Sequence, residues 1–144
     1  MLRRNFLKKA GAAVAAAAIA PVVLKASSDS PAFEPAGEPA GDEAGADFKI
    51  LSNEVKDGVR TVKAKTSAKV CSKAIDLQIN ESDGTIVSCA FTAGCPGNTC
   101  GICRLVKGMK ADEAGKLLRG TPCGAKGTSC PDQLSRAIEQ YLQQ

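Results

Sequence analysis

The sequence contains no histidine and no tryptophan, and it has one tyrosine and four phenylalanines among 144 residues. Without histidine, a zinc or iron–sulfur site in this chain has to be built almost wholly from cysteine thiolates. Few aromatic residues follow residue 48, so the hydrophobic core has to be small and aliphatic. Small domains often need a metal ion or disulfides to supplement such a core. Seven cysteines, all between Cys71 and Cys130, are the candidates for that supplement.

The chain also lacks a strong excess of positive charge once its first segment is set aside. Five of the 19 basic side chains lie within residues 1–26, so residues 27–144 carry 14 bases against 15 acids. No aromatic residues are interleaved among the lysines. This composition gives no strong nucleic-acid signal and favours an ordinary solvated surface.

Residues 1–26 resemble a twin-arginine export signal. Arg3 and Arg4 precede a Phe-Leu-Lys sequence and an alanine-rich apolar run over residues 10–24. As a helix that run would be about 22 Å long, which is short of the roughly 30 Å hydrocarbon core of a bilayer. A membrane-spanning helix is therefore not expected. An ordinary amphipathic helix is disfavoured, because the basic residues cluster ahead of the apolar run.

We therefore expect the twin-arginine translocase to export the protein to an extracytoplasmic site, in the periplasm or at the cell surface. Cleavage after Ala26 is favoured, and a retained leader would give membrane contact as a tether. Because this route is understood to carry folded proteins, it suits a domain whose cofactor is inserted before export.

Residues 27–48 are predicted to be a disordered spacer. They are rich in Pro, Ala, Gly and Ser, contain six acidic residues and no basic one, and up to residue 47 have no aliphatic side chain larger than alanine. The folded domain is accordingly predicted over residues 49–144.

The pattern within this domain predicts an α+β fold. Alternating apolar residues indicate a small antiparallel sheet of about three strands, over residues 59–65, 75–80 and 85–91. Helical spacing then predicts three helices packed on one face of the sheet, the second over residues 112–119 and the third from Pro131 to Leu142. Pro131 fits the first helical position, which makes Cys130 the expected N-cap.

Four cysteines lie outside these elements or at their ends, and three of them precede a turn-forming residue or a helix start. Together they are predicted to bind zinc or, less favourably, an iron–sulfur centre. Their spacings of 24, 28 and 7 residues differ from the paired pattern of a zinc ribbon. The four are Cys71, Cys95, Cys123 and Cys130.

The other three cysteines have different predicted roles. Cys100 and Cys103 form a C-x-x-C pattern near a helix start and are the candidate catalytic residues, as an accessible redox pair. Incidental thiols or a structural disulfide are the alternatives. Cys89 is predicted to be a small buried residue on the same strand face as Val87 and Phe91, in preference to a ligand role.

The sequence Thr-Ser-Cys-Pro-Asp at residues 128–132 resembles the signature of the TSCPD domain family. The likeness covers roughly residues 59–142, including the stretches 70–75, 94–98, 105–109 and 120–123, and the family's four shared cysteines match the four predicted ligands. The same domain occurs at the C-terminal end of adenosylcobalamin-dependent ribonucleotide reductases. That association implies nucleotide binding and ribonucleoside-diphosphate reduction. Adenosylcobalamin is not expected on this chain, which lacks the large barrel for radical chemistry.

Three functions follow as expectations. The first is an exported four-cysteine metal domain with a structural, partner-binding or accessory redox role. The second is an oxidoreductase component associated with ribonucleoside-diphosphate reductase, inactive alone, in which Cys100 and Cys103 relay electrons. The third is a metal-free, disulfide-stapled extracytoplasmic domain. The expected partner is a larger reductase or an exported redox protein.

Overall fold

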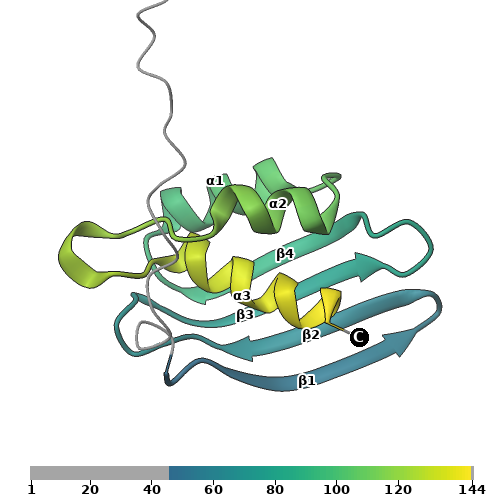
Figure 1. The fold of residues 1–144 in the computed structure, drawn as a ribbon, viewed down its shortest axis with the longest axis horizontal. Helices are drawn as coiled ribbons and strands as arrows, with labels where there is room; N and C mark the ends of the chain where they lie inside the picture. Colours follow the sequence, from purple (N-terminus) through teal and green to yellow (C-terminus); the bar gives the residue numbers. More distant parts are fainter. Residues whose placement is uncertain (1–45, 144) are drawn as a thin grey trace, which may run out of the picture. The chain divides into compact units, whose positions relative to one another are not determined.

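The computed structural model describes residues 46–143, so the leader and all but the end of the spacer lie outside the described residues. Four strands come first and form one antiparallel sheet in chain order (Figure 1). Three α-helices follow, with a short 3-10 helix, η2, before the last. The predicted α+β fold, a sheet followed by three helices, is confirmed. The elements are β1 (Lys49–Lys56), β2 (Val59–Lys65), β3 (Ser72–Asn80), β4 (Ile86–Ala93), α1 (Pro96–Val106), α2 (Ala111–Leu118), η2 (Gly124–Lys126) and α3 (Cys130–Leu142).

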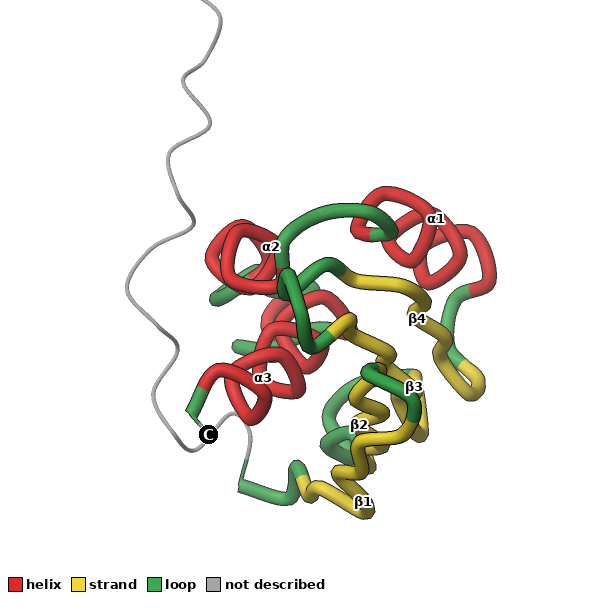
Figure 2. Tube along the Cα trace, turned by 90° about the vertical axis from the view of Figure 1, so that its right-hand side faces the viewer, coloured by secondary structure: helices red, strands yellow, loops and turns green. Residues whose placement is uncertain are grey.

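All three α-helices lie on one face of the sheet (Figure 2). Helix α3 packs on β2 and β3, α1 packs on β4, and α2 packs against α3. Strand β3 carries Ile75, Leu77 and Ile79 on its inner face, and all three are fully buried. Leu134 and Ile138 of α3 are buried against them. The alternating apolar residues of β3 and the helically spaced apolar residues of α3 thus pack together in one aliphatic core.

The sheet has four strands rather than about three, because the sequence interpretation missed β1. This edge strand is mostly polar and exposed, so it carries little of the hydrophobic alternation that marks an inner strand. A usable signal was nonetheless present. Asp57 and Gly58 join β1 to β2 with φ values of 52° and 75°. That left-handed pair is typical of a two-residue hairpin turn.

A bulge in β4 changes which residues face the core. Ile86 pairs with Ile79 while Ser88 pairs with Gln78, so Val87 is an extra residue between them. As a result Ile86 is buried and Val87 is 39% exposed. The prediction that Val87 shares the inner face with Cys89 and Phe91 was wrong, because periodicity alone does not reveal a bulge.

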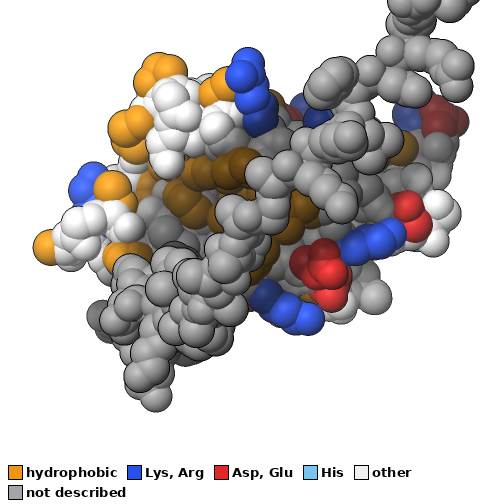
Figure 3. Space-filling model, turned by 90° about the horizontal axis from the view of Figure 1, so that it is seen from above, with side chains coloured by type: hydrophobic (Ala, Val, Ile, Leu, Met, Phe, Trp, Pro, Cys, Tyr) orange, Lys and Arg blue, Asp and Glu red, His pale blue; other side chains and the backbone are white. Residues whose placement is uncertain are grey.

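The helix side of the molecule carries both apolar and charged groups. Hydrophobic side chains lie in the recessed middle and along the left of the face in Figure 3, the acidic side chains lie toward its right beside basic ones, and further basic side chains lie at its left and top. Within residues 46–143, none of the helices has the length and apolar character needed to cross a bilayer.

Candidate thiolate centre

Cys71 lies in the connection between β2 and β3, directly before the first residue of β3. Thr66 holds this connection closed, because its hydroxyl donates to the carbonyl oxygen of Ser72 at 2.6 Å. The Sγ atom of Cys71 lies 3.7 Å from the Sγ atom of Cys95 and 3.7 Å from that of Cys130. Cys71 is therefore the sulfur shared by two close pairs.

Cys95 is the N-cap of α1 and follows a sharp turn out of β4. Ala93 and Gly94 form the turn with φ values of 61° and 98°. A Cβ atom on Gly94 would lie 3.1 Å from the methyl group of Thr99 and 3.5 Å from Ser72. This position therefore needs glycine, both for its backbone angle and for the close approach to the start of β3. The turn brings Cys95 beside Cys71.

Cys130 is the first residue of α3 and is buried, with 3% of the residue exposed. The predicted N-cap was wrong by one residue. Ser129 is the N-cap, since its hydroxyl accepts a hydrogen bond from the Asp132 N–H at 3.2 Å, and Pro131 is the second helical residue. Serine caps a helix better than cysteine, because its oxygen is a much stronger acceptor.

The Thr-Ser-Cys-Pro-Asp stretch is held by a buried network centred on Asp132, which is 2% exposed. Its carboxylate accepts hydrogen bonds from the Thr128 hydroxyl at 2.6 Å, the Gly120 N–H at 2.9 Å and the Arg136 guanidinium at 3.2 Å. The Ser129 hydroxyl donates to the carbonyl oxygen of Thr121 at 2.5 Å. These contacts join the end of α2 to the start of α3. They fix Cys130 in place from both sides.

Gln133 connects this network to the β2–β3 connection. Its side-chain amide donates to the Thr128 hydroxyl at 3.0 Å, and its carbonyl oxygen accepts from the Ser67 N–H at 2.9 Å. Gln133 is fully buried. The loop that carries Cys71 and the helix that carries Cys130 are therefore linked by hydrogen bonds as well as by their sulfurs.

Cys123 lies in the connection between α2 and α3, directly before η2, and is exposed. It is near enough for its charge to contribute to raising the pKa of Cys95. Among residues 46–143, no group of three or more cysteine or carboxylate side chains meets the geometry of an ion-binding site. The structure thus brings Cys71 together with Cys95 and with Cys130 in pairs, while Cys123 lies on the α2–α3 connection that leads to Cys130.

The hydrogen bonds at Cys71 favour its ionised form. The Cys95 backbone is the largest influence, and together with contacts from the Cys130 and Cys95 side chains it lowers the pKa of Cys71. The pKa of Cys95 is raised, because its thiol hydrogen-bonds Cys71 and its ionisation would place a second negative charge beside the first. Without a bound cation, the Cys71–Cys95 pair therefore favours one thiolate and one thiol, with a single proton between the two sulfurs.

The donor set fits a metal ion that prefers thiolate. Two sulfurs on one tetrahedral zinc, each about 2.3 Å from the ion, lie about 3.8 Å apart. Both Cys71 pairs are close to that separation. Cys95 and Cys130 also lie at the N-terminal ends of α1 and α3, where the helix dipoles are positive. An ion here would neutralise the charge that raises the pKa of Cys95.

The remaining cysteines lie apart, between β4 and α1. The Sγ atom of Cys103 is 2.9 Å from that of Cys89, and Cys100 is exposed one turn earlier on α1. The predicted C-x-x-C pair lies within α1, in the turns that follow its N-cap Cys95. The sequence interpretation favoured a buried core role for Cys89 over a ligand role and did not pair it with Cys103. The signal it lacked was the packing of α1 on β4, which places the two inward-facing cysteines opposite each other.

One of three comparisons with known proteins found a match. A family model described as the TSCPD domain matches residues 48–142, which is about two thirds of the chain. No curated protein and no solved structure matches the chain. The matched region contains the whole sheet, the three helices and all seven cysteines. The chain therefore belongs to the TSCPD domain family.

Proposed function

We propose that residues 49–144 form an exported domain stabilised by one metal ion, zinc in preference to an iron–sulfur centre. Cys71, Cys95, Cys123 and Cys130 would hold it. The observation that carries this proposal is the pair of 3.7 Å sulfur contacts that share Cys71. A [4Fe–4S] cluster places each cysteine on its own iron atom, which keeps the sulfurs farther apart than one shared ion does. The spacing therefore favours a mononuclear site.

Four protein thiolates leave no open position on a tetrahedral ion, so the site is structural rather than catalytic. When bound, the ion supplies charge neutralisation and cross-linking. It would tie together the β2–β3 connection, the start of α1 and the start of α3, which are distant in sequence. A small aliphatic core gains most from such a cross-link.

We further propose that the domain is an accessory module. A twin-arginine leader over residues 1–26 would export it already folded, and residues 27–48 would act as its spacer. The family's association with ribonucleotide reductases supports a larger reductase or an exported redox protein as its partner. Nucleotide binding and ribonucleoside-diphosphate reduction remain an alternative that rests on that association alone.

Metal content in single-cysteine variants tests the proposal. We expect about one zinc ion per chain in the wild type and a loss of most of it in Cys71→Ser, Cys95→Ser, Cys123→Ser and Cys130→Ser. Cys100→Ser is the matched control, because it also removes an exposed thiol but lies outside the quartet, and it should retain the ion. Equal metal content in all five variants, or none in the wild type, would overturn the proposal.

A metal-free, disulfide-stapled domain is the second candidate, and the 2.9 Å contact between Cys89 and Cys103 favours it. It predicts no metal and at most one free thiol in the protein purified without reductant, because seven cysteines leave one unpaired. Thiol counting on the samples used for metal analysis separates it from the first candidate, which keeps four thiolates on the ion.

A further inference from the structure

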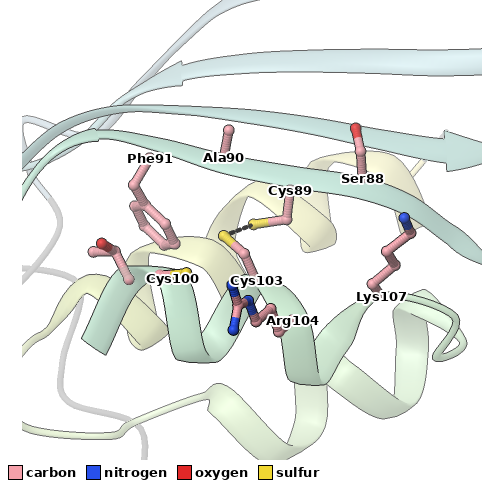
Figure 4. Close-up of a pocket in the computed structure, with 9 residues that line it drawn as sticks. Ser88, Cys89, Ala90, Phe91, Cys100, Cys103, Arg104 and Lys107 are labelled. Carbon is pink, nitrogen blue, oxygen red and sulfur yellow. Dashed lines mark hydrogen bonds between the residues drawn. The ribbon is translucent and has the colours of Figure 1, made fainter. Parts of the chain in front are cut away.

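An open groove of about 400 Å³ lies between β4 and α1 (Figure 4). Strand β4 forms one wall and α1 the other, and the side chains of Cys89 and Cys103 point toward each other across it. The groove is separate from the predicted metal ligands, since none of the four lines it. Its lining includes Cys89, Phe91, Cys100, Cys103, Arg104 and Lys107.

The two facing sulfurs are closer than those of the thiolate centre. Cys89 and Cys103 are 2.9 Å apart, compared with 3.7 Å for each pair that includes Cys71. A disulfide bond is about 2.05 Å long, so the sulfurs have to approach by about 0.9 Å to form one. Rotation about the side-chain bonds of the two cysteines is the movement that would close this gap.

On balance neither thiolate of this pair is stabilised, although the contact with Cys89 by itself lowers the pKa of Cys103. Both are half-buried, and burial is the largest influence that raises the pKa of Cys89 and of Cys103. Reactive thiols of strongly oxidising disulfides depend on stabilised thiolates in the reduced form. The absence of such stabilisation leaves the oxidised form of this pair the more persistent one.

We propose that Cys89 and Cys103, rather than Cys100 and Cys103, form a reversible disulfide between β4 and α1, and that small disulfides bearing carboxylates oxidise it through the groove. The oxidant class is that of the disulfides of low-molecular-weight thiols, such as glutathione disulfide. Arg104 and Lys107 give one end of the groove a positive charge, and Phe91 gives it an apolar wall.

The exchange takes two steps. The Cys103 thiol loses its proton to solvent, and its sulfur attacks one sulfur of the small disulfide. A mixed disulfide forms on Cys103 while the original S–S bond breaks, and the departing thiolate takes up a proton. Cys89 then loses its proton and attacks the Cys103 sulfur, which expels the second small thiolate to be protonated. One small disulfide is reduced to two thiols as the two cysteines are oxidised.

Peptide mapping of the full-length protein, supplied with zinc and treated with glutathione disulfide, tests this pairing. Free thiols are alkylated after denaturation, and the chain is cut with chymotrypsin without reduction. Cleavage after Phe91 separates Cys89 from the α1 cysteines. We expect residues 78–91 joined to residues 92–105, with fragmentation placing the link at Cys103. A disulfide within residues 92–105 and an alkylated Cys89, or no link at all, would overturn the inference.

Three variants give the matched controls. Cys100→Ser should form the linked peptides as completely as the wild type, whereas Cys89→Ser and Cys103→Ser should lose them. The rival C-x-x-C pair instead predicts a disulfide within residues 92–105, which Cys89→Ser keeps and Cys100→Ser loses. Zinc content measured on the same samples keeps the two proposals apart. A missing link with the ion retained contradicts this inference alone, and a complete link without any ion contradicts only the metal centre.

The charge of the groove is tested by comparing two oxidants. The ratio of the oxidation rate with glutathione disulfide to that with cystamine, a dication, should fall roughly fivefold in an Arg104→Gln/Lys107→Gln variant. Comparing this ratio between the variant and the wild type cancels the effect of the different leaving groups of the two reagents. An unchanged ratio would show that the groove does not select anionic disulfides.

Discussion

Asp132 is the residue whose hydrogen bonds hold the connection between α2 and α3. Its carboxylate receives the Thr128 hydroxyl, the Gly120 N–H and the Arg136 guanidinium in a nearly solvent-free setting. The residues of the Thr-Ser-Cys-Pro-Asp signature thus have different structural roles. Threonine and aspartate hold the loop, serine caps the helix, and cysteine presents the sulfur.

Replacing Asp132 with alanine should lower the free energy of unfolding by about 3 kcal/mol, because a charged guanidinium, a hydroxyl and a backbone N–H lose their acceptor. Asp76→Ala is the control. Its salt bridge to Lys63 lies on the surface, with side-chain exposures of 45% and 56%, and its loss should be worth less than about 1 kcal/mol. Urea denaturation of both variants measures the difference. Equal effects would show that the network contributes no more than a surface pair.

The buried thiol of Cys89 gives a pH dependence at alkaline pH. Because its pKa is raised by burial in the folded state, the folded protein keeps this proton above the ordinary cysteine pKa while the unfolded chain releases it. Its contribution to stability is therefore present below that pKa and is lost as the pH rises.

We expect the unfolding free energy of the reduced wild type to fall more steeply from about pH 8 to about pH 10 than that of Cys89→Ala. Denaturant titrations with reductant present measure the two slopes. Parallel slopes would mean that Cys89 titrates normally in the folded protein.

At the scale of elements, the turn from β4 into α1 sets the position of both cysteine clusters. It directs Cys95 toward Cys71 and lays α1 along β4, which brings Cys103 opposite Cys89. Gly94 is the residue that this turn depends on, since its φ of 98° is one that other residues rarely adopt.

Gly94→Ala should reduce stability by about 1–2 kcal/mol and lower the affinity for zinc, because the added methyl group meets Thr99 and Ser72. Gly97→Ala, in the first turn of α1, has open space around its Cβ position. It should be neutral or stabilising by up to about 1 kcal/mol. Thermal melting and a competitive zinc titration report both quantities. A Gly94→Ala protein that matches Gly97→Ala in both would contradict this role for the turn.

Elements with a strong hydrophobic pattern were predictable, and those without one were not. The alternation of Ile75, Leu77 and Ile79 identified β3, and helical spacing identified α3. Strand β1 escaped because an exposed edge strand gains little from burial, although Asp57 and Gly58 carried the turn signal. The contact between Cys89 and Cys103 depends on how α1 packs on the sheet, which local periodicity does not encode.

At the scale of the whole molecule, a bound metal ion would cross-link the segments at one end of the sheet in a domain that has few aromatic residues in its core. Segments separated by dozens of residues meet at Cys71, Cys95 and Cys130, and hydrogen bonds through Gln133 and Asp132 hold two of them. The Cys89–Cys103 pair would provide a second cross-link on the β4 side. Together the two clusters account for all seven cysteines except Cys100.

X-ray absorption at the zinc edge, on protein loaded with zinc under reducing conditions, tests the central claim most directly. The account predicts a first shell of four sulfur atoms at about 2.3 Å. With no histidine in the chain, a shell containing oxygen or nitrogen in place of one or more sulfurs would come from carboxylates, backbone or water. Such a shell, or protein that retains no zinc, would contradict a centre formed by Cys71, Cys95, Cys123 and Cys130.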